Sequence, residues 1–156
     1  MDFTGFFETI KINEGISLIT LHSVSNNANV RNLIFDAIRG ADVNLDMICQ
    51  TPNLGGGITV SLTMPDGQSA KALAALAGIK DRLNPAGTTV SPQNASVAFH
   101  SSRMVETPGV AAHIFAEFSK AGIEAALITT SDVSVSILVP KADASTAAAL
   151  AEKMRG

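Results

Sequence analysis

Few side chains in this sequence have the types and spacings that catalysis or metal binding requires. The three histidines, His22, His100 and His113, form neither an HxH nor an HxxxH pair of the kind that holds a metal ion. The Ser and Thr residues at 129–131 have no adjacent base and no nucleophile-elbow pattern, so serine catalysis has no support. We therefore expect no catalytic residue, no metal site and no cofactor.

Two further features have ordinary structural interpretations. Cys49 lies in an alternating strand pattern, where a small buried hydrophobic residue is expected, and a single cysteine cannot form an internal disulfide. The run Gly55-Gly56-Gly57 precedes a strand pattern, whereas a phosphate-binding glycine loop leads into a helix N-terminus. Phosphoryl transfer is therefore not predicted.

The composition limits the classes of partner. Of the 156 residues, 46% are hydrophobic and 16% charged, with 11 Lys and Arg against 14 Asp and Glu. A net charge of −3 gives no basic surface for nucleic acid or an anionic membrane. No apolar run approaches the roughly 18 residues of a membrane span, and the N-terminus has no signal-peptide pattern. We expect a cytoplasmic protein that binds neither nucleic acid nor membrane.

The chain contains an internal repeat. Residues 30–48, VRNLIFDAIRGADVNLDMI, align with residues 110–128, VAAHIFAEFSKAGIEAALI, at an offset of 80. Further on, ITVSLTM at 58–64 aligns with VSVSILV at 133–139 at an offset of 75. The second copy is therefore five residues shorter, and we place the difference in the hairpin at 50–57, which tolerates such changes.

Hydrophobic periodicity predicts the same element order, βαββα, in both copies. Gly40 and Gly122 each follow a helix end, where a left-handed backbone favours glycine. In the first copy we expect strands at 16–21, 43–50 and 58–64, a helix at 30–40 and, opened by a polar turn at 65–67, a helix that runs to about Leu83. In the second copy we expect strands at 96–104, 125–129 and 133–139 and helices at 110–120 and 143–154.

A βαββα unit needs one more strand to form a four-stranded antiparallel sheet with helices on one face, the ferredoxin-like βαββαβ arrangement. TTVSPQ at 88–93 supplies it in the first copy, whereas the second copy ends in its helix. The spare strand is FFETIKI at 6–12. We therefore predict an α+β fold of two interleaved domains, 14–94 and 1–13 plus 95–156, with the N-terminal strand completing the second.

The segment TPGVAAHIFAEFSKAGIEAALITTSDVSVSILV, residues 107–139, resembles the signature of ACT domains. VNLDMI at 43–48, Gln50 and the N-terminal TGFFETIKINEGISLITL at 4–21 extend the likeness. The tandem arrangement resembles the regulatory region of aspartate kinases, including the small regulatory subunit that some bacteria make. The resemblance covers nearly the whole chain and implies two ACT domains, with the N-terminal strand in the second.

In that family, paired ACT domains dimerise and bind a small amino acid, usually threonine or lysine, between a first domain and the second domain of the partner chain. The resemblance therefore implies a homodimeric, non-catalytic regulatory module with an amino-acid effector. Its implied partner is a kinase catalytic domain or subunit, for which this chain has no room.

The resemblance places one half of the effector site at the turn 25–31. Free amides and the positive dipole end of the following helix can hold a carboxylate there. Asn26 stands where the family carries Asp, and Asn29 stands where it carries Gly, next to Val30. Both asparagines also suit a helix cap or a turn, which is the alternative interpretation. Gln50 matches an effector-contacting Gln of the family, although it is otherwise a solvated strand end.

The other half of the implied site contains Glu124 and Ala125, where the family usually reads Asn-Ile. Glu124 can restore the negative charge that Asn26 lacks, or it is simply an exposed strand residue. Asn44 keeps the family residue in the first copy, so the resemblance also implies a second site with Asn44, Pro108 and Gly109.

A rival hypothesis is that the ACT pair has lost amino-acid binding and is only a dimerisation or protein-interaction module. The departures from the family pattern at Asn26, Asn29 and Glu124 favour this rival.

Overall fold

The structure of the chain, a computed structural model, describes residues 3–156. It divides into two compact units: Gly15–Pro92, which we call the first unit, and Met1–Glu14 with Gln93–Gly156, which we call the second unit. The elements in chain order are β1 (Thr9–Val24), α1 (Ala28–Gly40), β2 (Ile48–Pro52), β3 (Ile58–Pro65), α2 (Asp66–Ala77), α3 (Lys80–Leu83), β4 (Gly87–His100), η1 (Ser102–Glu106), α4 (Val110–Lys120), β5 (Leu127–Thr130), β6 (Ser134–Val139), η2 (Lys141–Asp143) and α5 (Ala144–Arg155).

Two long strands, β1 and β4, contribute to both units. The strand order β2-β3-β1-β4-β6-β5 gives the first unit a sheet of β2-β3-β1-β4 and the second unit a sheet of β1-β4-β6-β5. The Ala86 N–H donates to the His22 carbonyl at 2.8 Å in the first unit, and the Glu8 N–H donates to the His100 carbonyl at 3.0 Å in the second. The predicted fold class is confirmed, including the N-terminal strand that completes the second sheet.

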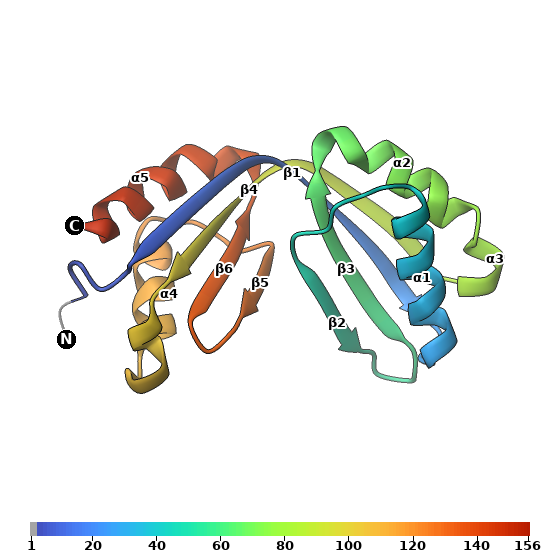
Figure 1. Cartoon of the computed structure of the whole chain (residues 1–156), viewed down its shortest axis with the longest axis horizontal. Coiled ribbons are helices and arrows are strands. Elements are labelled where there is room, and N and C mark those ends of the chain that lie inside the picture. The colour runs from blue at the N-terminus through green and yellow to red at the C-terminus, as the bar shows by residue number, and fades with distance from the viewer. Residues whose placement is uncertain (1–2) are drawn as a thin grey trace. The chain divides into compact units, whose positions relative to one another are not determined.

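In each unit the helices cover one face of the sheet (Figure 1). The stripe of Val30, Ile34 and Ile38 faces inward from α1, because residues three or four apart share one side of a helix. The matching stripe of α4 contains Val110, Ile114 and Phe118. Alternate residues of the central strands, such as Leu62 of β3 and Ile137 of β6, are fully buried beneath these helices.

The internal repeat is visible in the backbone hydrogen bonds. The N–H after α1, at Ala41, donates to the Ala37 carbonyl, and 80 residues later Ala121 donates to Glu117. The N–H groups of Asp46 and Ala126 likewise donate to Thr63 and Leu138, at the offsets of 80 and 75 read from the sequence. Two copies of one supersecondary unit therefore share the same local geometry.

Several strands and helices begin or end at other residues than predicted. The strand expected at 43–50 begins only at Ile48, because Thr63 holds the segment before it: Met47 N–H donates to the buried Thr63 Oγ1 at 2.8 Å. The helix expected to reach Leu83 breaks after Ala77 at Gly78, a poor helix former, and resumes as the short α3.

The strand expected at 96–104 also ends early, at His100. The buried Ser101 turns the chain, because its Oγ accepts the Arg103 N–H at 3.3 Å and caps the 3-10 helix η1. A capping serine at this point competes with continuation of the strand.

The helix ends differ between the two copies. Gly122 adopts φ +70° after α4, as predicted, but the prediction for Gly40 was wrong: Gly40 is the last residue of α1, and the left-handed residue is Asp42, at φ 53°. Asp42 and Gly122 are equivalent at the offset of 80. The first copy therefore uses a residue with a Cβ where the second uses glycine, at a cost in backbone strain.

We expect Asp42→Gly to raise the free energy of unfolding by roughly 0.5–1 kcal/mol, because glycine adopts the left-handed conformation without steric penalty. The mirror variant Gly122→Asp should lower it, since a Cβ there meets nothing within 4 Å and only the backbone strain changes. Urea denaturation of both variants measures this. Equal or lower stability of Asp42→Gly would contradict the strain assigned to Asp42.

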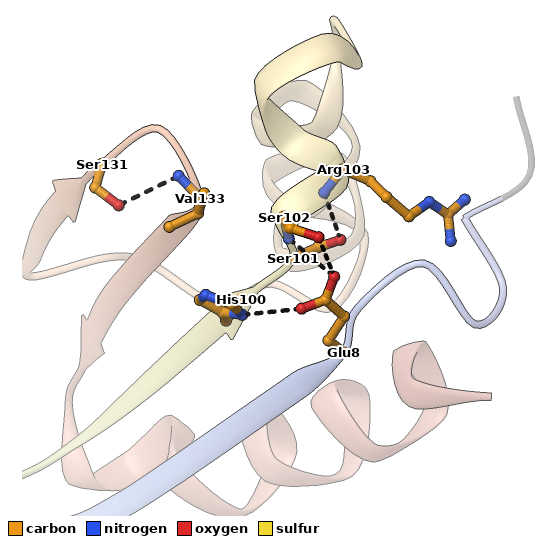
Figure 2. A network of polar contacts seen from close by, with 7 residues as sticks. All are labelled: Glu8, His100, Ser101, Ser102, Arg103, Ser131 and Val133. Atoms are coloured by element: carbon orange, nitrogen blue, oxygen red, sulfur yellow. Dashed lines mark hydrogen bonds and ion pairs between the residues drawn. The ribbon is translucent and has the colours of Figure 1, made fainter.

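A polar network ties the N-terminal segment to the end of β4 (Figure 2). The Glu8 carboxylate accepts hydrogen bonds from the Ser102 hydroxyl and, at 3.1 Å, from the Ser102 N–H. His100 Nδ1 lies 3.6 Å from the same carboxylate. The Ser102 hydroxyl and N–H bonds, with the nearby His100 and Arg103 charges, lower the pKa of Glu8 below its ordinary value of 4.5. The network therefore favours the ionised carboxylate.

A lowered pKa means that Glu8 stabilises the folded state while it is ionised and loses that contribution as pH falls through the folded-state pKa. Glu8→Gln should therefore lower the thermal midpoint at pH 7, and the gap to the parent should close as pH falls below 4.5. Thermal denaturation from pH 7 to pH 3 measures the gap. Glu106→Gln, at an exposed carboxylate, is the matched control. If the difference in thermal midpoint does not change with pH, the ionisation of Glu8 does not stabilise the folded state.

Candidate functional site

The turn before α1 is organised by Asn27, not by either asparagine singled out from the sequence. Asn27 is the N-cap: its side-chain oxygen accepts the Val30 N–H at 2.9 Å, three residues on. The capping interpretation of Asn26 and Asn29 was therefore wrong. The signal was present in the sequence, because Asn27 also has the residue type and the spacing of a cap.

The remaining polar groups of this turn suit an anion. Asn26 Oδ1 accepts a hydrogen bond from Arg31 Nη1 at 3.0 Å, which holds a guanidinium beside the helix start. Within residues 3–156, no acceptor satisfies the N–H groups of Ala28 and Asn29, and the first turn of α1 contains no acidic residue. Open amides, the helix dipole and a nearby cation all favour a carboxylate. Sequence reasoning did not assign Arg31 a role.

Val30 contributes less to this turn than the sequence suggested. Its side chain is 4% exposed and belongs to the core of the first unit, and its N–H is already occupied by Asn27. Asn29 is exposed within the first turn of the helix. The groups open to a ligand are therefore the amides before Val30 rather than Val30 itself.

Gln50 lies on β2, the edge strand of the first unit, and is exposed. Its register partner is Val60, which is buried on the helix-covered side of the sheet. Paired residues of antiparallel strands point to the same side, so the Gln50 side chain emerges on the side that carries α1. This position allows the amide of Gln50 to serve a ligand held beside that helix.

Each unit has a surface hollow between the end of its first helix and the strand that follows. The hollow of the second unit has a volume of about 250 Å³, and the hollow of the first about 360 Å³. Every lining residue of one is equivalent to a lining residue of the other at the offset of 80. The lining residues are Phe115, Phe118, Ser119, Gly122, Ile123, Glu124 and Ala125 in one and Phe35, Ile38, Arg39, Asp42, Val43, Asn44 and Leu45 in the other.

The two hollows differ in charge at three equivalent positions: Ser119, Gly122 and Glu124 in the second unit stand against Arg39, Asp42 and Asn44 in the first. Glu124 puts a carboxylate in the hollow of the second unit, and within the described part of the chain that carboxylate has no hydrogen-bond or ion-pair partner. Asn44 is neutral, and its backbone N–H donates to Gln68 Oε1 at 2.7 Å. The lining with Glu124 and Ala125 therefore has a net negative charge, which suits a cation in partly apolar surroundings, whereas in the lining with Asn44 the charges of Arg39 and Asp42 cancel.

Pro108 and Gly109 form the turn before α4, the counterpart of the turn before α1. Gly109 is the N-cap residue at φ 89° and has no side chain to cap the helix, so the first amides of α4 are open. Its carbonyl accepts the His113 N–H at 2.9 Å. This second turn differs from the turn before α1, because α4 begins two aligned residues later, after the left-handed Gly109, and Ala111 stands where the first copy has Arg31.

The described residues do not assemble a catalytic centre from the sites above. Among residues 3–156, no group of three or more His, Cys, Asp and Glu side chains could hold a metal ion. In the exposed network of Figure 2, Ser102 donates to the Glu8 carboxylate rather than to His100, so no serine–histidine pair forms there. Also within residues 3–156, no helix is long and apolar enough to cross a lipid bilayer.

The chain is similar in sequence and in fold to known proteins. Residues 97–154 match a protein family described as "ACT domain". The chain is 28% identical over 135 residues to Aspartokinase 2 of Bacillus subtilis, a match that covers 86% of this chain and 33% of the relative. The chain thus spans about a third of the length of the curated relatives that it matches.

Two solved structures show the same fold over nearly the whole chain. The aspartate kinase of Synechocystis superimposes with a TM-score of 0.88 at 25% identity, over 97% of this chain and 27% of that protein. The regulatory subunit of aspartate kinase from Thermus flavus superimposes with a TM-score of 0.85 at 20% identity, over 96% of this chain and 99% of that one.

The repeated units, the shared strands and these matches converge on one assignment. Residues 97–154 match the ACT-domain family, and over most of its length the chain is similar in sequence to aspartokinases and in fold to solved aspartate kinase structures.

Proposed function

We propose that the chain is a non-catalytic regulatory module that binds a small amino acid of the threonine or lysine type at inter-domain clefts of a homodimer. Its regulated partner is an aspartate-kinase catalytic domain or subunit. Each unit is then one ACT domain. The similarity to an isolated regulatory subunit over 99% of that subunit's length supports a role apart from catalysis.

One observation carries this proposal: each unit has its two ligand-binding features at opposite ends of its first helix. The anion-binding turn lies before α1, and the hollow lies after it. Since α1 has 13 residues at about 1.5 Å each, roughly 20 Å separates the two. A free amino acid is far too short to span that distance. The two halves must therefore come from different domains, as a dimer with reversed pairing would provide.

The residues suggest how the ligand is held. Its carboxylate binds the open amides of Ala28 and Asn29, with the charge of Arg31 nearby and the Gln50 amide alongside. Its ammonium binds Glu124, contributed with the Ala125 backbone by the facing domain. This pairing keeps both ligand charges matched by opposite charges. Asn44, Pro108 and Gly109 form the second, less charged site.

Regulation follows from linkage between effector binding and the arrangement of the domains. An effector shifts the partner enzyme only by the difference between its affinities for the two arrangements. A site divided between two domains makes that difference large, because separating the domains removes half of the contacts.

A second candidate function is dimerisation without effector binding. Ile48 and Ile128 are equivalent at the offset of 80, lie on the edge strands β2 and β5, and are 49% and 41% exposed. Exposed isoleucines on open strand edges favour pairing with another chain whether or not a ligand is present. This interpretation retains the dimer and the kinase partner but not the amino acid.

The test is a thermal-denaturation scan of the purified chain with each of the twenty amino acids at millimolar concentration, followed by calorimetry on each hit. A ligand at 100 times its Kd should add about 2.7 kcal/mol of stability, which shifts the midpoint by several degrees. Glu124→Gln should weaken binding roughly tenfold by removing the partner of the ammonium. Glu106→Gln, at an exposed carboxylate outside the hollow, should leave binding unchanged.

A different result of the same scan would favour dimerisation without effector binding. If no amino acid raises the midpoint while sedimentation shows a dimer, the chain is an interaction module. If an amino acid binds Glu124→Gln as tightly as it binds the parent, Glu124 does not hold the ammonium.

A further inference from the structure

The first unit has another hollow, of about 420 Å³, in a different place from those beside α1. It lies between the helices α2 and α3 and the start of β4 (Figure 1). Leu21, Leu76 and Leu83 are buried side chains in its lining, and the exposed Lys80 and Thr88 also line it. Its volume lies within the range of small-molecule sites.

The internal repeat identifies the residues of the second unit that are equivalent to the lining of this hollow. Leu21 and Phe99 are equivalent, because they pair with Val60 and Val135, which correspond at the offset of 75. The next residue on each strand, His22 or His100, accepts the N–H of Ala86 or Glu8. The residue before that donor is Pro85 in the first unit and Phe7 in the second. Phe7 is therefore the counterpart of Pro85.

In the second unit, aromatic rings occupy this place. The Phe7 ring lies 5.1 Å from the Phe99 ring and 5.4 Å from the Phe6 ring, and Phe6 is in edge contact with Phe3 at 5.1 Å. All four side chains are buried in the core of that unit. In the first unit Leu21 and Pro85 offer much less volume, so a space of aromatic size stays open.

The charge around the hollow selects between ligand classes. The Lys80 ammonium has no hydrogen-bond or ion-pair partner within residues 3–156, and no acidic residue lines the hollow. An unpartnered cation beside an apolar cavity favours an anion with an apolar body. A free amino acid suits the hollow less well, because no carboxylate lines it to pair with the ammonium.

We propose that this hollow binds a small aromatic monocarboxylate, with the ring against Leu21, Leu76 and Leu83 and the carboxylate at Lys80. The ring takes the place that Phe7 occupies in the other copy. The Thr88 hydroxyl, on the edge strand of this sheet, donates a second hydrogen bond to the carboxylate. The site is separate from the proposed amino-acid site, and it stands or falls independently of it.

The experiment uses 3-phenylpropanoate as the probe and the full chain labelled with ¹⁵N for amide NMR. We expect saturable shifts confined to Leu21 with its strand neighbours and to residues 73–77 and 80–88. Lys80→Gln should weaken binding about fivefold, the scale of one exposed ion pair. Lys11→Gln, at an exposed lysine of the second unit, should leave it unchanged. The amine 3-phenylpropylamine should bind far more weakly than the carboxylate.

A second variant tests whether the hollow corresponds to the space that the Phe7 ring fills in the second unit. Pro85→Phe puts into the first unit the ring that Phe7 supplies in the second, and it should abolish probe binding while the amide spectrum stays folded. Any of three results would overturn the proposal: shifts that do not saturate, shifts centred on residues 26–50, or equal binding of the amine and the carboxylate. If Pro85→Phe fails to fold, the Lys80→Gln and amine comparisons decide.

Discussion

The pairing of β1 with β4 is the constraint on which the rest of this structure depends. Each strand runs through both units, and the pairing joins Glu8 to His100 in one unit and His22 to Ala86 in the other. A sheet edge left without its outer strand would expose backbone donors and acceptors together with the apolar face beneath the helices. The N-terminal segment is therefore a structural part of the second unit, although more than 80 residues separate it from its partner strand. The Glu8 network and the Phe3, Phe6 and Phe7 rings secure it there.

This interleaving gives the two copies different surroundings and lets them diverge. The hairpin registers stay equivalent, because the same backbone must close the same sheet. Side chains at equivalent positions differ where the sheet does not constrain them: Glu124 against Asn44, Gly122 against Asp42, and Phe7 against Pro85. The first copy therefore carries the capped, Arg31-bearing turn, and the second carries the anionic hollow. In the proposed function, the groups for the ligand's carboxylate and those for its ammonium therefore lie in different copies of the same fold.

That division explains how a small domain can be regulatory. Neither the open amides at the start of α1 nor the carboxylate of Glu124 would bind a zwitterion strongly alone, since each interacts with only one of the two ligand charges. The α1 helix is too long for one ligand to reach both ends of one unit. In the function proposed above, ligand binding then favours the association of domains, and a ligand-dependent association is what an allosteric module transmits. The hollow beneath α2 and α3 has a different origin, a gap left where the first copy lacks the aromatic residues of the second.

The sequence by itself determined the repeat, the βαββα order and the need for the strand at 6–12, because burial periodicity and turn residues are local properties of the chain. The resemblance to ACT domains also pointed to the asparagine-rich turn, Gln50, Glu124 and Ala125, and their role in binding stays a prediction. Only the tertiary structure decided that Asn27 rather than Asn26 or Asn29 caps α1, that Val30 is committed to the core, and that Asp42 takes the left-handed position. The hollows and their lining residues also became visible only in the tertiary structure. Those outcomes depend on competition between neighbouring groups for the same hydrogen bond or the same space, and such competition is resolved only when distant segments pack.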